Sequence, residues 1–88
     1  MAYEISHSKK FLKFSLKLSV QHQKHLALLL ELLEENPFNP KLHTKLLSGK
    51  LAGFYSFRIT REYRVMFRFA PNNIIELVDI AHRKDVYR

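Results

Sequence analysis

The hydrophobic positions of the chain follow two different periods, and the change between them falls near residue 55. Residues 9–18 and 20–35 place apolar side chains three and four positions apart, the spacing of a helix with one buried face. From residue 55 onward, apolar and polar side chains alternate, as they do along a strand with one buried face. The pattern therefore predicts helices in the first half of the chain and a sheet in the second.

Serines and prolines mark the expected ends of the helices. Ser8 and Ser19 precede the two helical segments and are predicted N-caps, because a serine hydroxyl can accept a hydrogen bond from a first-turn amide. The second helix is predicted to run from residue 20 to residue 35 and to stop before Pro37, since proline cannot continue the hydrogen-bond ladder. Residues 41–47 are expected to form a short extra turn of helix. The wide apolar stripe of the second helix is expected to contact both the sheet and the first helix; it consists of Leu26, Leu28, Leu29, Leu30, Leu32 and Leu33.

Four segments are predicted to be strands. They are residues 3–6, 55–60, 63–69 and 74–80. The last is apolar on both faces except at Glu76 and Asp79, which is typical of an interior strand. The order β-α-α-β-β-β predicts a single α+β domain over residues 1–88. In it, an N-terminal helical hairpin packs on a mostly antiparallel four-stranded sheet.

The pairing of the two central strands follows from their alternation. If the apolar side chains of both strands face the helices, Phe57 lies opposite Val65. The same register places Arg58 opposite Arg64 on the other face of the sheet. The asparagines of the following turn, Pro71-Asn72-Asn73, are expected to tolerate a positive φ.

Charge and composition narrow the classes of partner. The chain has 88 residues, a formal net charge of +7 and no cysteine. A surplus of this size favours polyanions, whereas the lack of cysteine excludes a disulfide scaffold and a thiolate metal site. His22 and His25 are three apart on a helix, but a third ligand is not apparent, so no metal and no cofactor is predicted. The longest apolar run is far shorter than the ~20 residues that cross a bilayer, and no signal peptide is visible, so a cytoplasmic protein is expected.

Three segments together carry a resemblance to a known family. They are Gly53–Thr60, Tyr63–Phe67 and Ile80–Tyr87. In this combination the chain resembles the RelE/ParE superfamily of toxin–antitoxin toxins over nearly its whole length, and it looks like the RelE branch, whose members cut mRNA in the ribosomal A site. The resemblance implies a metal-free ribonuclease, in which the ribose 2′-hydroxyl attacks the adjacent phosphate and leaves a 2′,3′-cyclic phosphate.

The resemblance also implies a role for particular residues. Arg58 and Arg64 would neutralise the charge that develops on the phosphate, and Arg83 would steady or protonate the leaving 5′-oxygen. Tyr87 would stack on a base beside the cut. His82 is the nearest candidate for the proton acceptor, because an arginine has too high a pKa to act as a general base.

Two positions depart from the family pattern and keep alternatives open. Ser56 stands where RelE has a lysine, and Lys45 stands at the loop position where related branches have a glutamate. A ParE-like toxin that blocks DNA gyrase without cutting RNA is the first alternative. A catalytically silent member that retains only antitoxin binding is the second.

The implied partners follow from the same resemblance. They are a cognate antitoxin, acidic enough to suit a basic toxin, and the ribosome with its A-site mRNA. Promoter DNA would be contacted only through the toxin–antitoxin complex. No membrane partner is expected.

Overall fold

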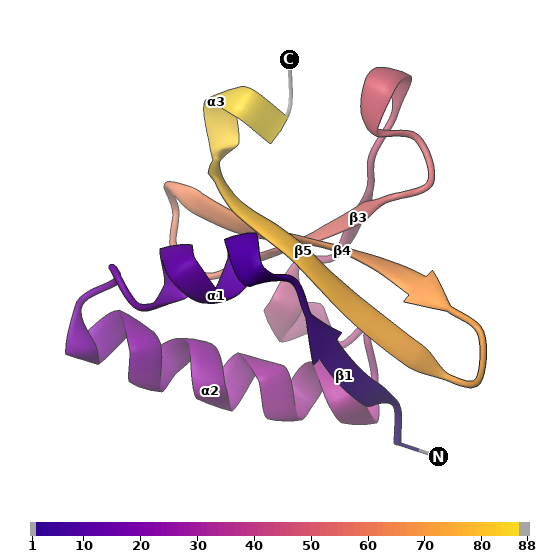
Figure 1. Cartoon of the computed structure of the whole chain (residues 1–88), viewed down its shortest axis with the longest axis horizontal. Coiled ribbons are helices and arrows are strands. Elements are labelled where there is room, and N and C mark those ends of the chain that lie inside the picture. The colour runs from indigo at the N-terminus through magenta and orange to yellow at the C-terminus, as the bar shows by residue number, and fades with distance from the viewer. Residues whose placement is uncertain (1, 87–88) are drawn as a thin grey trace.

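A helical layer and a twisted sheet make up the molecule in this computed structural model, which describes residues 2–86 (Figure 1). The two α-helices of the first half, α1 and α2, lie on one side of the sheet, and a short C-terminal helix, α3, follows its last strand. The elements are β1 (Glu4–His7), α1 (Lys9–Ser15), α2 (Val20–Glu35), η1 (Pro40–Leu42), β2 (Lys45–Leu46), η2 (Gly49–Leu51), β3 (Tyr55–Arg58), β4 (Tyr63–Ala70), β5 (Ile74–His82) and α3 (Arg83–Val86).

The sheet has the strand order β1-β5-β4-β3-β2. β1 runs parallel to β5, and the other pairs are antiparallel. The predicted register of the central hairpin is confirmed, because Phe57 pairs with Val65 and Arg58 with Arg64. β5 lies between two neighbours, as its apolar sequence predicts, and its pairing with β4 shifts by one residue between Met66 and Phe67.

The main hydrophobic core fills the space between the helices and one face of the sheet, which we call the helical face. Its fully buried members include Leu33 from α2, Phe57 from β3 and Phe67 from β4. Because a strand alternates its side chains, the residues between these apolar positions point to the opposite face. We call that opposite face the arginine face, since it carries Arg58 and Arg64.

Both predicted caps are present. The Ser8 hydroxyl oxygen accepts a hydrogen bond from the Phe11 amide at 3.0 Å, and the same hydroxyl donates to the Val78 carbonyl at 2.6 Å. This second bond ties the start of α1 to β5. The Ser19 hydroxyl accepts from the His22 amide at 3.1 Å, and α2 spans the predicted residues 20–35.

The structure corrects three local expectations. Residues 41–47 do not form an extra helical turn: a 3₁₀ turn ends at Leu42, His43 adopts a positive φ of 51°, and β2 follows as a short fifth strand. The apolar stripe of α2 is also narrower than predicted, since Leu28 is 61% exposed. The first helix ends at Ser15, whereas the pattern placed its end at residue 18.

The turn between β4 and β5 follows the expectation from its asparagines. Asn72 and Asn73 have φ values of 67° and 59°. Within the part of the chain that the structure describes, no helix combines the length and the apolar character needed to cross a membrane.

Candidate nucleic-acid site on the arginine face

Arg58 and Arg64 lie directly opposite each other on the two central antiparallel strands. On its other side Arg64 pairs with Ala81 of β5. Arg58, Arg64 and Ala81 therefore occupy directly paired positions on three neighbouring strands. Two guanidinium groups that start from paired positions of a rigid sheet can bind one phosphate together, because guanidinium is always charged and matches the geometry of phosphate oxygens.

The Arg64 side chain is held in place by the backbone of the preceding turn. Its Nη1 lies 2.8 Å from the Thr60 carbonyl oxygen, 3.0 Å from that of Arg61 and 3.2 Å from that of Tyr63. The residue is only 6% exposed. These bonds fix the guanidinium before any ligand arrives, which is the preorganisation that electrostatic stabilisation of a transition state requires.

Arg58 is held differently. Its Nε is buried, and among residues 2–86 it has no hydrogen-bond partner. A buried donor without an acceptor costs roughly 1–3 kcal/mol, and more when it is charged. The arginine pair therefore combines one guanidinium fixed by backbone carbonyls with one whose buried Nε has no acceptor within residues 2–86.

Ser56 lies next to Arg58 on the same face. It pairs with Lys45 of β2 on one side and with Met66 of β4 on the other. Ser56 is fully buried, whereas Lys45 is exposed at the edge of the sheet. The position at which RelE has a lysine is therefore interior here, and Lys45 supplies a cation one strand further out.

His82 is not brought together with the arginine pair. It pairs with Tyr63, whose ring packs against the main core, and the two rings are 5.6 Å apart on the helical face. The His82 Nε2 lies 2.9 Å from a Glu62 carboxylate oxygen. Its predicted use as a proton acceptor stays a prediction, and its ring faces away from Arg58 and Arg64.

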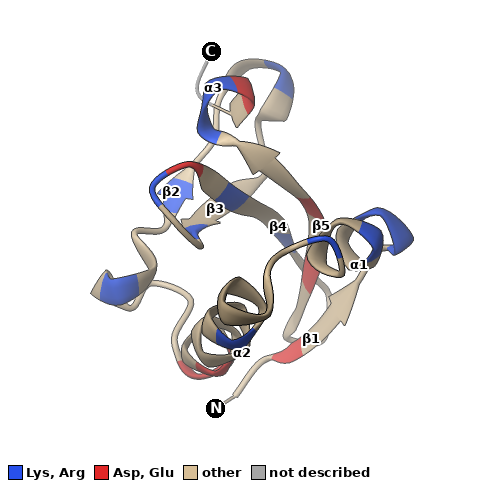
Figure 2. Ribbon diagram, turned by 90° about the vertical axis from the view of Figure 1, so that its left-hand side faces the viewer, with Lys and Arg blue, Asp and Glu red and all other residues tan. Residues whose placement is uncertain are grey.

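Arg83 follows His82 and begins α3. Its backbone amide donates to the Glu62 carbonyl at 2.8 Å, which anchors the start of the helix, and the residue is exposed. Tyr87, the predicted stacking residue, lies outside the described residues. Figure 2 shows that basic positions occur on the strands, on α3 and on α1, so the charge extends well beyond the arginine pair.

A pocket between the η2 loop and α3 was not predicted from the sequence. Its cavity volume is about 450 Å³, and it is lined by Ser48, Gly49, Lys50, Leu51, Asp85 and Val86. Behind it lies a second, smaller apolar cluster formed by Leu47, Met66 and Val86. The only signal in the sequence was the pair of glycines that brackets this loop, because a loop and a terminal helix meet here only through the tertiary fold.

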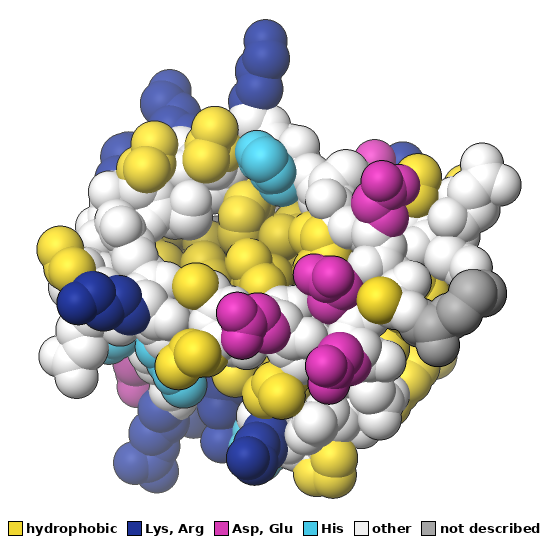
Figure 3. Space-filling view, turned by 90° about the horizontal axis from the view of Figure 1, so that it is seen from below, with side chains coloured by type: hydrophobic (Ala, Val, Ile, Leu, Met, Phe, Trp, Pro, Cys, Tyr) yellow, Lys and Arg dark blue, Asp and Glu magenta, His cyan; other side chains and the backbone are white. Residues whose placement is uncertain are grey.

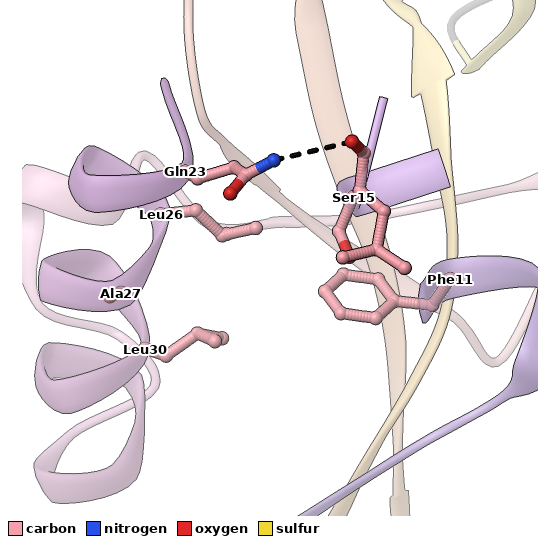
Figure 4. A pocket seen from close by; sticks show the side chains of 7 residues that line it. Phe11, Ser15, Gln23, Leu26, Ala27 and Leu30 are labelled. Atoms are coloured by element: carbon pink, nitrogen blue, oxygen red, sulfur yellow. Dashed lines mark hydrogen bonds between the residues drawn. The ribbon is translucent and has the colours of Figure 1, made fainter. Parts of the chain in front are cut away.

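A second hollow lies on the opposite side of the molecule, between α1 and α2. The space-filling view from below shows hydrophobic side chains gathered in this hollow, with acidic side chains along part of its rim (Figure 3). The cavity has a volume of about 190 Å³ and is lined largely by apolar side chains. In Figure 4, Leu26 and Leu30 of α2 point toward Phe11 of α1, and Gln23 closes one end through a 3.3 Å hydrogen bond to the Leu16 carbonyl.

Metal ligands do not gather in the described part of the chain. Within residues 2–86 there is no group of three histidine, aspartate, glutamate or cysteine side chains placed to hold an ion. The guanidinium and ammonium groups of this region can stabilise developing negative charge.

Several solved structures share this fold. The structure is similar to a YoeB/ParE toxin from Agrobacterium tumefaciens, with a TM-score of 0.78, 19% identity, and coverage of 91% of this chain and 98% of that chain. It is similar to the archaeal RelE in a RelE–RelB complex from Pyrococcus horikoshii, with a TM-score of 0.79, 23% identity, and coverage of 94% and 97%. A YoeB–YefM toxin–antitoxin complex from Staphylococcus aureus matches with a TM-score of 0.73, 21% identity, and coverage of 92% and 97%. The fold is therefore that of the RelE-like toxins.

The sequence itself carries the family assignment. The family described as the ParE toxin of the type II toxin–antitoxin system, parDE, matches residues 6–87. The chain belongs to this family and so to the RelE/ParE superfamily of type II toxin–antitoxin toxins. Among curated protein sequences, none matches this chain at a significant level.

Proposed function

We propose that this toxin is a metal-independent endoribonuclease that cuts mRNA in the ribosomal A site and so inhibits translation. The observation that carries the proposal is the arginine pair: Arg58 and Arg64 pair across two strands, Arg64 is fixed by three carbonyls, and the Arg58 Nε is buried beside it without an acceptor among residues 2–86. Two cations held in this way suit a phosphate whose charge increases in the transition state.

The reaction follows from that electrostatic role. The ribose 2′-oxygen attacks the adjacent phosphorus and loses its proton, and the bond from phosphorus to the 5′-oxygen breaks. The 5′-oxygen takes up a proton, which gives a 2′,3′-cyclic phosphate and a free 5′-hydroxyl. Arg58 and Arg64 stabilise the pentacoordinate phosphate, Arg83 steadies or protonates the leaving oxygen, and Tyr87 stacks on a neighbouring base.

Primer extension on mRNA in programmed ribosomes tests the proposal. Wild type should produce cleavage in the A site, and Arg58→Ala and Arg83→Ala should reduce it strongly. Arg68→Ala is the matched control, because Arg68 lies on the same face of β4 but is bound to Glu76 at 2.7 Å. Cleavage that is lost equally in the control would contradict a role specific to the arginine pair.

A ParE-like gyrase inhibitor is the second candidate. Two observations favour it: the matching family carries the ParE description, and His82 contacts Tyr63 and Glu62 and not the arginine pair. Intact mRNA in the primer-extension assay, together with loss of gyrase supercoiling, would establish this alternative. If both targets remain unaffected, the chain is a silent member that binds only its antitoxin.

The partner that we propose is an acidic antitoxin in the cytoplasm. The similar structures from Pyrococcus horikoshii and Staphylococcus aureus are complexes with RelB and YefM, respectively. In this chain the hollow between α1 and α2 is the surface suited to an antitoxin segment, since Leu12 and Leu16 are exposed beside it and α1 carries Lys9, Lys10 and Lys13. Promoter DNA would be contacted only within the toxin–antitoxin complex.

A further inference from the structure

The turn between β3 and β4 contacts two of the candidate arginines, Arg64 and Arg83, through consecutive carbonyl groups. The carbonyl oxygens of Thr60 and Arg61 lie 2.8 and 3.0 Å from the Arg64 Nη1. The carbonyl oxygen of the next residue, Glu62, accepts a 2.8 Å hydrogen bond from the Arg83 amide. One short segment of backbone therefore fixes the side chain of Arg64 and the main chain of Arg83, which come from different elements of the fold.

Arg83 begins a helix that is too short to be stable by itself. α3 contains only the four residues Arg83–Val86 and follows β5 directly (Figure 1). Isolated helices of fewer than about 12 residues are marginal in water, so contacts with the rest of the protein must hold α3 in place. Val86 is buried at the end of the helix. At its start, the contacts come from Glu62 and His82.

The His82 ring connects the β3–β4 turn to the start of α3. Its Nδ1 accepts a 3.2 Å hydrogen bond from the Lys84 amide. An imidazole nitrogen that accepts carries no proton, so in the neutral ring the proton is on Nε2. Nε2 lies 2.9 Å from a Glu62 carboxylate oxygen and donates to it. The Tyr63 ring packs edge-on against the imidazole, with 5.6 Å between the ring centroids, and limits its rotation.

Both ring nitrogens of His82 are therefore engaged within the protein, which suits a positioning role better than exchange of a proton with a substrate. Stabilisation of the fold explains the arrangement poorly. The His82 side chain is 30% exposed and that of Glu62 54%, and pairs with this exposure contribute little to the free energy of unfolding. Geometry is a better explanation, because a displacement of about 1 Å in a catalytic group can reduce a rate about 100-fold.

We infer that Glu62 and His82 are positioning residues that hold Arg83 at a fixed place relative to Arg64. In this role His82 acts through Arg83 and does not take the proton of the ribose. The consequence for catalysis rests on the proposed ribonuclease function, whereas the hold on α3 is a property of the folded chain alone. The two can therefore fail separately.

Amide hydrogen exchange of the whole chain, measured by NMR without any RNA, tests the hold on α3. Glu62→Ala should speed exchange at Arg83 and Lys84 several-fold, whereas Glu62→Gln should change it little, because the amide oxygen still accepts from Nε2–H. His82→Asn should speed exchange at Arg83 and leave Lys84 protected, because an asparagine side chain can accept from the amide two residues on. Unchanged exchange in the core strands shows that each variant is folded.

Cleavage of mRNA on programmed ribosomes tests the consequence for catalysis. Glu62→Ala should lower the maximal single-turnover rate about tenfold, within the loss that a small misplacement causes. The toxin concentration at half-maximal rate should not change, and Glu62→Gln should restore most of the rate. In an Arg83→Ala background, Glu62→Ala should have no further effect, because the effects of residues that act through one group are not additive.

Glu76→Ala is the matched control for both measurements. Glu76 is a carboxylate on the same sheet, in an exposed ion pair with Arg68 at 2.7 Å, so this variant changes the charge by the same amount as Glu62→Ala. Neither the exchange at Arg83 nor the maximal cleavage rate should change. A tenfold loss of rate in the control would show that charge, and not position, explains the effect of Glu62→Ala.

Each outcome decides a separate point. Unchanged exchange at Arg83 in Glu62→Ala would overturn the inference, whether or not the protein cuts mRNA. Faster exchange in a protein that cuts no mRNA would uphold the hold on α3 and refute the ribonuclease. If the protein cuts, an additive loss in the double variant would show that Glu62 acts independently of Arg83 and would overturn its role as a positioning residue.

Discussion

The two faces of one sheet differ in what they contain and in what holds them. The helical face carries a continuous apolar core in which Leu33, Phe57 and Phe67 are fully buried. The arginine face carries only a small apolar cluster around Met66, next to Arg58 and Arg64. Neighbouring residues of a strand point to opposite faces. The residues that stabilise the core and the residues of the candidate site therefore alternate along the same strands. Substitutions should therefore separate the two properties.

The largest effect is expected in the main core. Phe67→Ala removes a fully buried ring that packs 6.0 Å from the ring of Phe57, and it should lower the free energy of unfolding by about 3–5 kcal/mol. Urea denaturation followed by circular dichroism measures this change. Leu28→Ala is the control on α2, because Leu28 is exposed and its loss should change stability by less than about 0.5 kcal/mol.

Substitutions on the arginine face should reduce mRNA cleavage more than they reduce the free energy of unfolding. Arg58→Ala should raise the barrier to mRNA cleavage by about 3–4 kcal/mol, by analogy with the loss of one oxyanion-hole donor. Its unfolding free energy should not fall, because alanine removes a buried Nε donor that has no hydrogen-bond partner within residues 2–86 and whose burial is unfavourable. Single-turnover cleavage on programmed ribosomes, compared with urea denaturation of the same sample, provides both values. A variant that cleaves like wild type would remove Arg58 from the proposed site.

Arg64 should behave differently from Arg58, although the two are directly opposed. Its guanidinium binds the carbonyls of Thr60, Arg61 and Tyr63, so Arg64→Ala should lower the unfolding free energy by about 1.5–3 kcal/mol in addition to reducing cleavage. The two arginine variants should be compared in the same denaturation series. Equal stability of the two would show that the carbonyl contacts of Arg64 contribute little to folding.

The smallest effects are expected at the helix caps, where the two serines form a matched pair. Ser8→Ala should lower the unfolding free energy by about 1–2 kcal/mol, since Ser8 caps α1 and also donates to the Val78 carbonyl of β5. Ser19→Ala loses only its cap and should cost about 0.5–1 kcal/mol. Urea denaturation of the two variants measures which one has the lower unfolding midpoint. A larger loss of unfolding free energy in Ser19→Ala would contradict the proposed link between α1 and β5.

Much of the fold was predictable because it depends on local periodicity. The limits of α2, both serine caps and the pairing of Phe57 with Val65 followed from spacing and capping chemistry alone. The pairing is strongly determined, because a slip by one residue would turn every aromatic side chain of the strand to the wrong face. Residues 41–47 were wrongly expected to be helical, since their conformation depends on β2 pairing with β3.

The candidate site was predictable only in part. The opposition of Arg58 and Arg64 follows from the same register as the core. The placement of His82 on the helical face also depends on register. His82 pairs with Tyr63 at the C-terminal end of β5, and the irregularity near Met66 precedes this pair along β5. A one-residue shift in a strand reverses the face of every later residue, and the sequence of β5, which is apolar on both sides, does not reveal where such a shift falls.

The sequence by itself determined which residues are apolar, how they repeat, and hence that a helical hairpin covers one face of a sheet while arginines occupy the other. The tertiary structure decided which distant segments meet: Ser48–Leu51 with α3 around a pocket, three carbonyls around Arg64, and Glu62 beside His82. The physical reason is that periodicity depends on neighbours within a few residues. Contacts between loops and chain ends depend instead on how complete elements pack against one another.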